Sequence, residues 1–267
     1  MRQSGLQSRL ILRTKCQNMT TPKTYVDIIC APREIFTLQA MNQPRPTQPS
    51  KPCDAEGVVK FALSFSHAAA PTLESIAELN AWRQILYRLG LIGREPLRYH
   101  GLAYGNVSTR TAGHQFIISG TQTGAKVYLS PVDYCLVLDF DLGENRLCAE
   151  GPVEPSSEAL SHGAIYAANP QVNCVLHVHS PELWRNAAAL GICQTDAAIA
   201  YGTPAMGVAV GLAASHRAAG IIAMGGHEDG IIAYAETVRL AALELVGWLA
   251  KAEEFELWAG RAGLQDQ

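Results

Sequence analysis

The 267-residue sequence lacks the marks of several protein classes. No apolar run approaches the roughly 20 residues that cross a membrane, because Gly, Pro, His or a charged residue interrupts each one. The seven cysteines form no CxxC pair and are odd in number, which argues against a secreted disulfide framework and favours reduced thiols in the cytoplasm. The net charge of −3 gives no general attraction to nucleic acid or to an anionic membrane. No GxGxxG follows a predicted strand, so the nucleotide-binding fingerprint is missing as well.

The composition changes once, near the start of the chain. Residues 1–55 carry five basic residues before the first acid, Asp27, and continue into a proline-rich stretch over 42–52. Such a segment offers little apolar surface to bury, so we expect a flexible extension followed by a single folded domain over 56–267. An extended start or upstream translation explains the extension better than a weak transit-like signal does.

The rest of the chain alternates between helical and strand patterns. Apolar spacing predicts a helix over 72–89 with Thr72 as its N-cap, and further helices at 157–168, 181–190, 205–218 and 235–255. Short strands are expected at 115–119, 126–130, 134–140, 145–149, 173–180, 219–224 and 230–234. The turn at Gly143 predicts an antiparallel hairpin. The pattern therefore indicates an α/β protein with a mixed sheet and helices on both faces.

Two histidines alternate with a valine at the end of one apolar strand, in the segment NCVLHVHS over 173–180. Residues i and i+2 of a strand lie on one face, so His177 and His179 can converge on one ion. A second apolar segment, IIAMGGH, runs into His227. An HxH pair alone is more often a pair of ordinary core or surface histidines. Together with His227 it predicts a metal site of zinc type.

An isolated carboxylate stands near the start of a predicted helix, in the segment PSSEALSH over 155–162. Glu158 lies in the first turn and His162 follows one turn later. Three histidines at strand ends and one carboxylate make a metal site with an open position and a nearby base. We expect His162 to support this site rather than to bind the ion.

Two further segments have the composition of anion-binding loops. YGNVSTR over 104–110 and SGTQTGAK over 119–126 combine glycine with hydroxyl and amide side chains. Both can present N–H and hydroxyl groups to a phosphate, although the same residues also favour ordinary turns. Arg110 and Lys126 either neutralise the phosphate or are solvated surface residues.

In chain order the sequence contains GNVS (105–108), TQTG (121–124), PSSE (155–158), HVH (177–179), YGT (201–203) and GH (226–227). This series resembles the class II aldolase and adducin head family over about residues 72–257. The resemblance implies a three-layer α/β/α sandwich with a mixed, largely antiparallel central sheet. It also implies a homotetramer that binds Zn²⁺ or another divalent metal near its subunit interfaces.

The resemblance assigns roles to individual residues. His177, His179 and His227 match the zinc ligands, and Glu158 matches the carboxylate that exchanges a proton with the substrate. The positions that hold the substrate phosphate in the aldolases match Asn106, Thr123, Gly124, Ser156 and Ser157.

The activity implied by the resemblance is the retro-aldol cleavage of a small ketose phosphate through an enediolate that zinc stabilises. Epimerase, dehydratase or decarboxylase chemistry on a related sugar phosphate or sugar acid phosphate remains an alternative, because each passes through a similar enolate. A non-catalytic interaction module of the adducin type is a third possibility, which the complete set of histidines and Glu158 disfavours.

Two departures from the family pattern stand out. No tyrosine between His179 and Tyr201 matches the one that the aldolases donate from a neighbouring subunit to protonate the leaving aldehyde. Glu228 and Asp229 follow His227, where the family usually has glycine. These two acids are either solvated turn residues or groups that alter metal affinity and substrate charge preference.

We predict that residues 1–55 are dispensable for folding and for the metal site. A chain that starts at Glu56 should keep its circular dichroism spectrum and its metal content, because the removed segment has little apolar surface to contribute. Loss of both properties on truncation would show that the extension is part of the domain.

Overall fold

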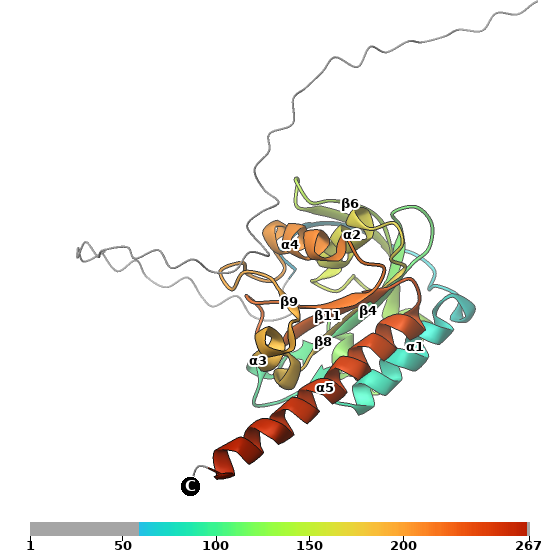
Figure 1. The fold of residues 1–267 in the computed structure, drawn as a ribbon. Coiled ribbons are helices and arrows are strands. Elements are labelled where there is room, and N and C mark those ends of the chain that lie inside the picture. The colour runs from blue at the N-terminus through green and yellow to red at the C-terminus, as the bar shows by residue number, and fades with distance from the viewer. Residues whose placement is uncertain (1–58, 266–267) are drawn as a thin grey trace, which may run out of the picture. The chain divides into compact units, whose positions relative to one another are not determined.

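A nine-stranded mixed sheet is the central element of the computed structural model, which describes residues 59–265, without the side chains of 260–265 (Figure 1). The strand order is β1-β7-β6-β5-β4-β8-β11-β10-β9. In chain order these strands are β1 (Ala62–His67), β4 (Asn106–Arg110), β5 (Phe116–Ser119), β6 (Tyr134–Asp141), β7 (Arg146–Gly151), β8 (Cys174–His179), β9 (Cys193–Gln194), β10 (Gly220–Ala223) and β11 (Gly230–Ala235). A separate two-stranded sheet pairs β2 (Gly93–Arg94) with β3 (Ala103–Tyr104).

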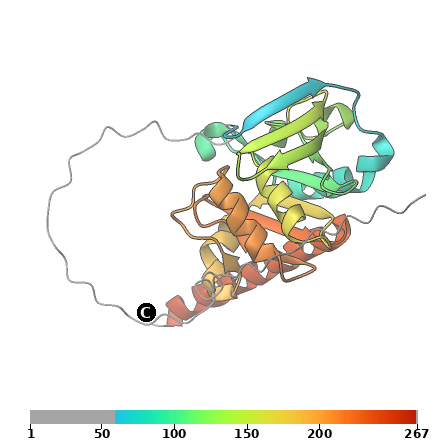
Figure 2. The same cartoon turned by 90° about the horizontal axis from the view of Figure 1, so that it is seen from above.

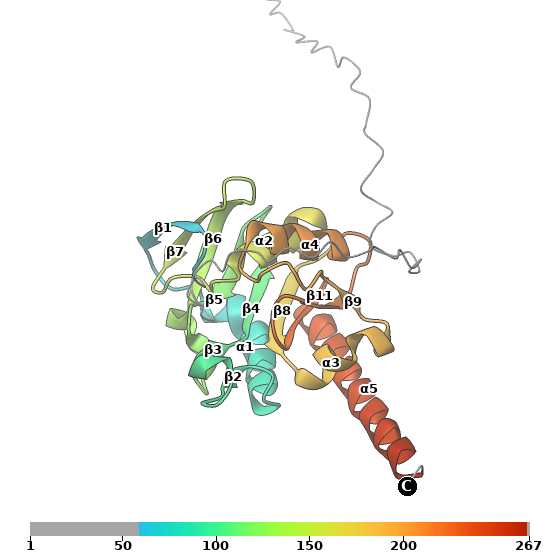
Figure 3. The ribbon, with the colours of Figure 1, turned by 90° about the vertical axis from the view of Figure 1, so that its left-hand side faces the viewer.

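The pairing of the strands confirms the expected mixed sheet. β1 pairs with β7 and β9 with β10 in parallel, and the other neighbours in the nine-stranded sheet are antiparallel. The predicted hairpin around Gly143 is formed by β6 and β7. Figure 3 shows β1, β7 and β6 at one end of the sheet and β9 towards the other.

Helices cover both faces of this sheet. They are α1 (Leu73–Arg88), α2 (Ala159–Ala168), α3 (Pro181–Leu190), α4 (Pro204–Ala214) and α5 (Val238–Gln265). Helices α1, α3 and α5 share one apolar core with the sheet, and α2 and α4 share a second core on the opposite face (Figure 1). Helices α2 and α4 also pack against each other (Figure 2).

Side-chain caps fix the starts of three helices. The hydroxyl of Thr72 accepts a hydrogen bond from the N–H of Ser75, which confirms the predicted N-cap of α1. Helices α3 and α4 begin in the same way at Ser180 and Thr203, each followed by a proline at the first helical position. The cap of α3 comes directly after the histidine strand, so the chain turns sharply away from His179.

Parts of the structure differ from the sequence-based expectation. The segment 126–130, expected as a strand, connects two short 3-10 helices, Thr123–Ala125 and Pro131–Asp133. Its carbonyl groups at Val127 and Leu129 accept hydrogen bonds from side chains of α1 instead of from a neighbouring strand. Contacts with α1 therefore replace strand pairing in this segment. The alternation of apolar and polar residues along the segment does not reveal these contacts.

Other differences concern short or edge elements. Strands β1, β2, β3 and β9 were not expected from the sequence pattern, and the start of β4 was expected as a turn. The helix expected at 205–218 ends at Ala214, and the one expected at 235–255 runs from Val238 to Gln265. The predicted extension 1–55 lies outside the described residues. Over the part of the chain that the structure describes, no helix has both the length and the apolar character needed to cross a membrane.

Close backbone packing shapes the turn between β10 and β11. A Cβ atom added at Gly226 would lie 1.8 Å from the carbonyl oxygen of Ile199, and one added at Gly225 would lie 2.2 Å from that of Thr195. The segment 195–199 therefore lies directly against the turn that carries His227. Only glycine leaves room for this approach.

We predict opposite effects for two glycine-to-alanine substitutions. Gly226→Ala should lower the free energy of unfolding by about 3 kcal/mol, because two backbone segments must move apart. Gly247→Ala in α5 should raise it by about 0.5–1 kcal/mol, because no atom lies within 4 Å of the added Cβ and alanine favours a helix. Urea unfolding of both variants measures the effects, and equal stability of the two would contradict the packing described.

Candidate metal centre and active site

Three buried histidines meet at the ends of two neighbouring strands. His177 and His179 lie on one face of β8, and His227 lies in the turn between β10 and β11. One ring nitrogen from each lies within 4.8 Å of those of the other two, and each residue is at most 3% exposed. On β8, Leu176 precedes His177 and Val178 lies between the two histidines. Both apolar side chains point into the core on the side of α1 and α5. The alternation of the strand thus separates the imidazoles from that core.

Aromatic rings hold the imidazoles in place. Tyr99 packs edge-on against His179 at 4.4 Å between ring centroids, and Tyr104 lies 5.1 Å from the same ring. Tyr201 stacks on His227 at 4.3 Å. These contacts restrict the rotation of the rings and so keep their nitrogens aimed at one point.

Glu158 lies against two of the three imidazoles. It is the N-cap residue of α2 and is 3% exposed. Its Oε2 atom is 2.8 Å from Nε2 of His177, and its Oε1 atom is 3.2 Å from Nδ1 of His227. Burial alone raises the pKa of Glu158, but the charges and hydrogen bonds of the two imidazoles outweigh it and hold the pKa well below its usual range.

The hydrogen bond of His177 on its other ring nitrogen shows that its contact with Glu158 needs a cation. Its Nδ1 atom is 3.2 Å from the carbonyl oxygen of Ile231, and because a carbonyl only accepts, Nδ1 carries the proton. In the neutral ring Nε2 then has a lone pair directed at the carboxylate of Glu158. Two lone-pair atoms at this distance need a cation, either an added proton or a metal ion. Three imidazoles and a carboxylate are a donor set that suits zinc, so the residues fit the expected metal.

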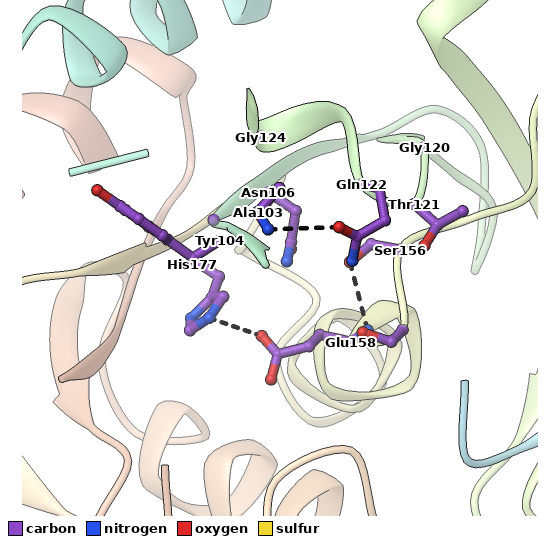
Figure 4. Close-up of a pocket in the computed structure, with 12 residues that line it drawn as sticks. Ala103, Tyr104, Asn106, Gly120, Thr121, Gln122, Gly124, Ser156, Glu158 and His177 are labelled. Atoms are coloured by element: carbon purple, nitrogen blue, oxygen red, sulfur yellow. Dashed lines mark hydrogen bonds and ion pairs between the residues drawn. The ribbon is translucent and has the colours of Figure 1, made fainter. Parts of the chain in front are cut away.

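A polar pocket adjoins the histidines (Figure 4). A bridge between Gly120 and Pro155, and a hydrogen bond from the N–H of Thr121 to the carbonyl of Glu154, hold the loop 120–124 beside the segment that leads into α2. Asn106, which pairs with His177 across β4 and β8, adds an amide from the sheet. The lining residues are Ala103, Tyr104, Gly105, Asn106, Gly120, Thr121, Gln122, Gly124, Ser156, Ser157, Glu158 and His177.

The structure places four of the five expected phosphate-binding residues in this lining: Asn106, Gly124, Ser156 and Ser157. Thr123 is buried and its hydroxyl donates to the carbonyl of Gly120, so it shapes the loop from within. The lining also includes Thr121, Gln122 and Tyr104, which the sequence analysis did not single out. The signal in the sequence was their place in the two glycine-containing segments 104–110 and 119–126.

The basic residues next to these segments have other partners. Lys126 forms an ion pair with Asp133 at 2.5 Å. Arg110 donates to the carbonyls of Gly113, Tyr166, Asn169 and Val172, and so closes the C-terminal end of α2. Neither contact directs a positive charge into the pocket.

His162, the histidine one turn after Glu158, has a defined partner. It is buried, and its Nδ1 atom lies 2.7 Å from the hydroxyl of Ser108, behind Glu158. Burial lowers the pKa of His162 to about 3, with a smaller contribution from His177, so its ring is neutral. It is not among the three clustered histidines.

The two acids after His227 differ from each other. Glu228 is exposed, whereas Asp229 is buried and accepts hydrogen bonds from Arg98 at 2.5 Å and from the hydroxyl of Tyr99 at 2.6 Å. Asp229 therefore anchors the tyrosine that packs on His179. One acid is a solvated turn residue and the other is part of the support of the histidine cluster.

Comparison with protein-family models matches residues 96–247, more than half of the chain, to the class II aldolase and adducin N-terminal domain. Solved structures show the same fold. An L-fuculose-1-phosphate aldolase from Thermus thermophilus aligns with a TM-score of 0.51 and 20% identity, over 71% of this chain and 97% of that chain. A sugar-phosphate aldolase from Thermotoga maritima aligns with a TM-score of 0.53 and 18% identity, over 71% of this chain and 96% of that chain.

One curated protein shares a short segment with the chain. Methylthioribulose-1-phosphate dehydratase of Xanthomonas euvesicatoria pv. vesicatoria (strain 85-10) is 44% identical over 46 residues. These residues are 17% of this chain and 19% of that protein, so the match describes a segment and not a whole enzyme.

We predict that the purified protein binds about one divalent ion per chain, with a preference for zinc, because three buried imidazoles converge. His177→Ala and His179→Ala should each empty the site, whereas His216→Ala, which removes an exposed histidine, should leave the metal content unchanged. Elemental analysis of the three variants measures the effect. A well-folded wild-type protein that takes up no metal would contradict the assignment.

Proposed function

Because the chain belongs to the class II aldolase and adducin N-terminal domain family, we propose that it is a metal-dependent aldehyde-lyase that cleaves a small ketose phosphate by a retro-aldol reaction. The single observation that carries this proposal is the contact of Glu158 with two of three clustered imidazoles, at the wall of a polar pocket. A base, a metal-binding set and a polar pocket therefore lie next to one another.

His177, His179 and His227 are the residues that would hold the ion. When bound, zinc or another divalent metal supplies Lewis-acid polarisation of the carbonyl and hydroxyl oxygens of the substrate. The carboxylate of Glu158 and the polar pocket lie next to these ligands, where a substrate would be placed.

Glu158 is the proposed proton-transfer group. Its low pKa keeps it ionised at neutral pH, as a base requires. Its position at the start of α2 fixes the carboxylate between His177 and the pocket wall (Figure 4). A substrate hydroxyl that enters between the metal ligands and Ser156 would thus meet the carboxylate at close range.

The polar pocket is the proposed site of the phosphate group. Amide, hydroxyl and backbone groups of the lining are suited to the oxygen atoms of a phosphate. The proposed phosphate-binding residues are Asn106, Thr123, Gly124, Ser156 and Ser157, with Thr123 acting through the shape of the loop.

Dehydration of a ketose phosphate is the second candidate function. The segment shared with methylthioribulose-1-phosphate dehydratase favours it, and the same base and metal set would serve. The chain also has no tyrosine between His179 and Tyr201 to act as the proton donor of the aldolases. Epimerase and decarboxylase reactions use the same groups, whereas a non-catalytic adducin-like role leaves the buried Glu158 and histidine cluster without a purpose.

We also propose the wider properties that the family suggests. The helices on both faces of the mixed sheet support a three-layer α/β/α sandwich. A homotetramer that acts on carbohydrate substrates in the cytoplasm is the proposed working form, and cysteines outside any disulfide, such as Cys135, Cys148 and Cys174, suit that compartment. A flexible extension over 1–55 and one domain over 56–267 complete this proposal.

Glu158→Gln tests the proposal, because it keeps the shape of the side chain but removes the basic oxygen. On a substrate found by product analysis of a ketose-phosphate panel, turnover should fall by roughly 10²-fold or more, with metal content unchanged. Glu154→Gln, which changes an exposed carboxylate four residues upstream, is the matched control and should keep full turnover.

Two outcomes would contradict these roles. Full activity of Glu158→Gln would place proton transfer elsewhere, with Glu228 and Asp229 the next residues to replace. Loss of metal from Glu158→Gln, with metal retained in His177→Ala, would show that the carboxylate holds the ion. The products of the panel separate cleavage from dehydration.

A further inference from the structure

The pocket proposed for the phosphate has no cationic side chain in its lining. Among the described lining residues the only group with a full charge is the carboxylate of Glu158, which repels an anion. The nearby cations Lys126 and Arg110 are bound to Asp133 and to the end of α2. A doubly charged ligand therefore needs a positive charge from some other place.

Arg83 supplies such a charge from behind the loop. It belongs to α1, yet it is only 1% exposed, because its side chain runs under the loop 120–127. Its guanidinium donates to the carbonyls of Thr123 at 3.1 Å, Gly124 at 3.0 Å and Val127 at 3.0 Å. Since Gly124 lines the pocket, a single peptide group separates the guanidinium from the cavity wall.

Among the described residues, the charge of Arg83 is not held in an ion pair with an acid, although the carboxylate of Asp133 is close enough to raise the pKa of Arg83. That carboxylate is already paired with Lys126. Burial lowers the pKa of Arg83, but a guanidinium stays protonated in proteins. The partners of this buried cation are neutral carbonyls and the ring of Tyr87, whose centroid lies 4.9 Å from the guanidinium carbon. Such burial is costly, and an anion in the adjoining pocket would offset part of that cost.

The same contacts orient the loop. The C=O and N–H of one peptide point in opposite directions, so a Thr123 carbonyl held by Arg83 turns the N–H of Gly124 away from Arg83. Gly124 also lies so close to β3 that a Cβ atom would be 2.4 Å from the carbonyl oxygen of Tyr104. The loop is therefore clamped between α1 and β3.

We propose that Arg83 is a positioning residue that provides the pocket with its positive charge, through the backbone of Thr123 and Gly124, for a phosphate dianion. This inference rests on the proposed function, since it concerns the phosphate end of the same site. The competing explanation is that Arg83 only fastens the loop to α1. Substitutions of Arg83 that keep the positive charge can be compared with substitutions that remove it. This comparison separates the effect of the charge from the effect of fastening the loop.

The experiment measures the binding of inorganic phosphate to the full-length, metal-loaded protein by titration calorimetry at pH 8 and low salt. Arg83→Met removes the charge and should weaken binding about tenfold or more, as expected for a buried charge close to the ligand. Arg83→Lys keeps a charge and should lose less than about threefold. Arg110→Met is the matched control: it removes an arginine that also holds several carbonyls, at the opposite end of β4 from Asn106, and should bind phosphate like the wild type.

A pH series adds a measurement that a fastening role would not affect. Burial lowers the pKa of a lysine, so phosphate affinity of Arg83→Lys, relative to the wild type, should fall as the pH rises through that pKa. If Arg83→Met does not fold, Arg83→Gln takes its place beside Arg83→Lys, because both keep a polar head group. Equal affinity of the neutral and charged variants would overturn the inference.

The outcomes distinguish the two proposals. A wild-type protein that binds no phosphate would contradict the proposed function itself. Phosphate binding by the wild type that Arg83→Met leaves unchanged would contradict only the role of Arg83. A loss in Arg110→Met as large as that in Arg83→Met would show a general effect of destabilisation and would also overturn it.

Discussion

The buried contact between Glu158 and the imidazoles of His177 and His227 constrains the whole site. A carboxylate at 3% exposure has lost most of its water, and the Nε2 lone pair of a neutral His177 repels it at 2.8 Å. A metal ion held by the histidines would supply the positive charge that this contact calls for. Metal binding would then stabilise this region. The packing of α2 on the sheet holds the carboxylate of Glu158 beside these imidazoles.

The fold separates this charged cluster from its two apolar cores. Alternation along β8 sends Leu176 and Val178 into the core under α1 and α5, and sends the histidines to the opposite face. On that face the start of α2 supplies Glu158 instead of an apolar side chain. The glycine turn before His227 lets the segment 195–199 lie directly against that turn. The position of His227 therefore depends on the same close backbone packing.

The sequence predicted the parts of the site that depend on short-range pattern. The HVH alternation fixes which face of β8 carries the imidazoles, and the structure does bring His177, His179 and His227 together. The mixed sheet and the Thr72 cap were also predictable, because hairpin turns and N-caps are local signals. By contrast, the strand expected at 126–130 was wrong. Its alternating residues satisfy a strand pattern, but its carbonyls bind α1, and that contact joins residues more than 40 positions apart. Long-range polar contacts also decided the roles that the sequence left open: Asp229 follows a glycine-rich turn and has the composition of a solvated residue, yet Arg98 and Tyr99 bury it.

The two ends of the site place their charged groups differently. At the histidine end, the charge of Glu158 lies directly against two imidazoles, so under the proposed function reactivity would depend on a few ring nitrogens and one carboxylate. At the pocket end, neutral amide, hydroxyl and backbone groups form the wall, and the cation stands one peptide group behind it. A charge held at that depth would attract an anion without forming a tight ion pair with it. In the proposed function, the neutral wall would fix the position of a phosphate dianion, and the chemistry would take place at the histidine end.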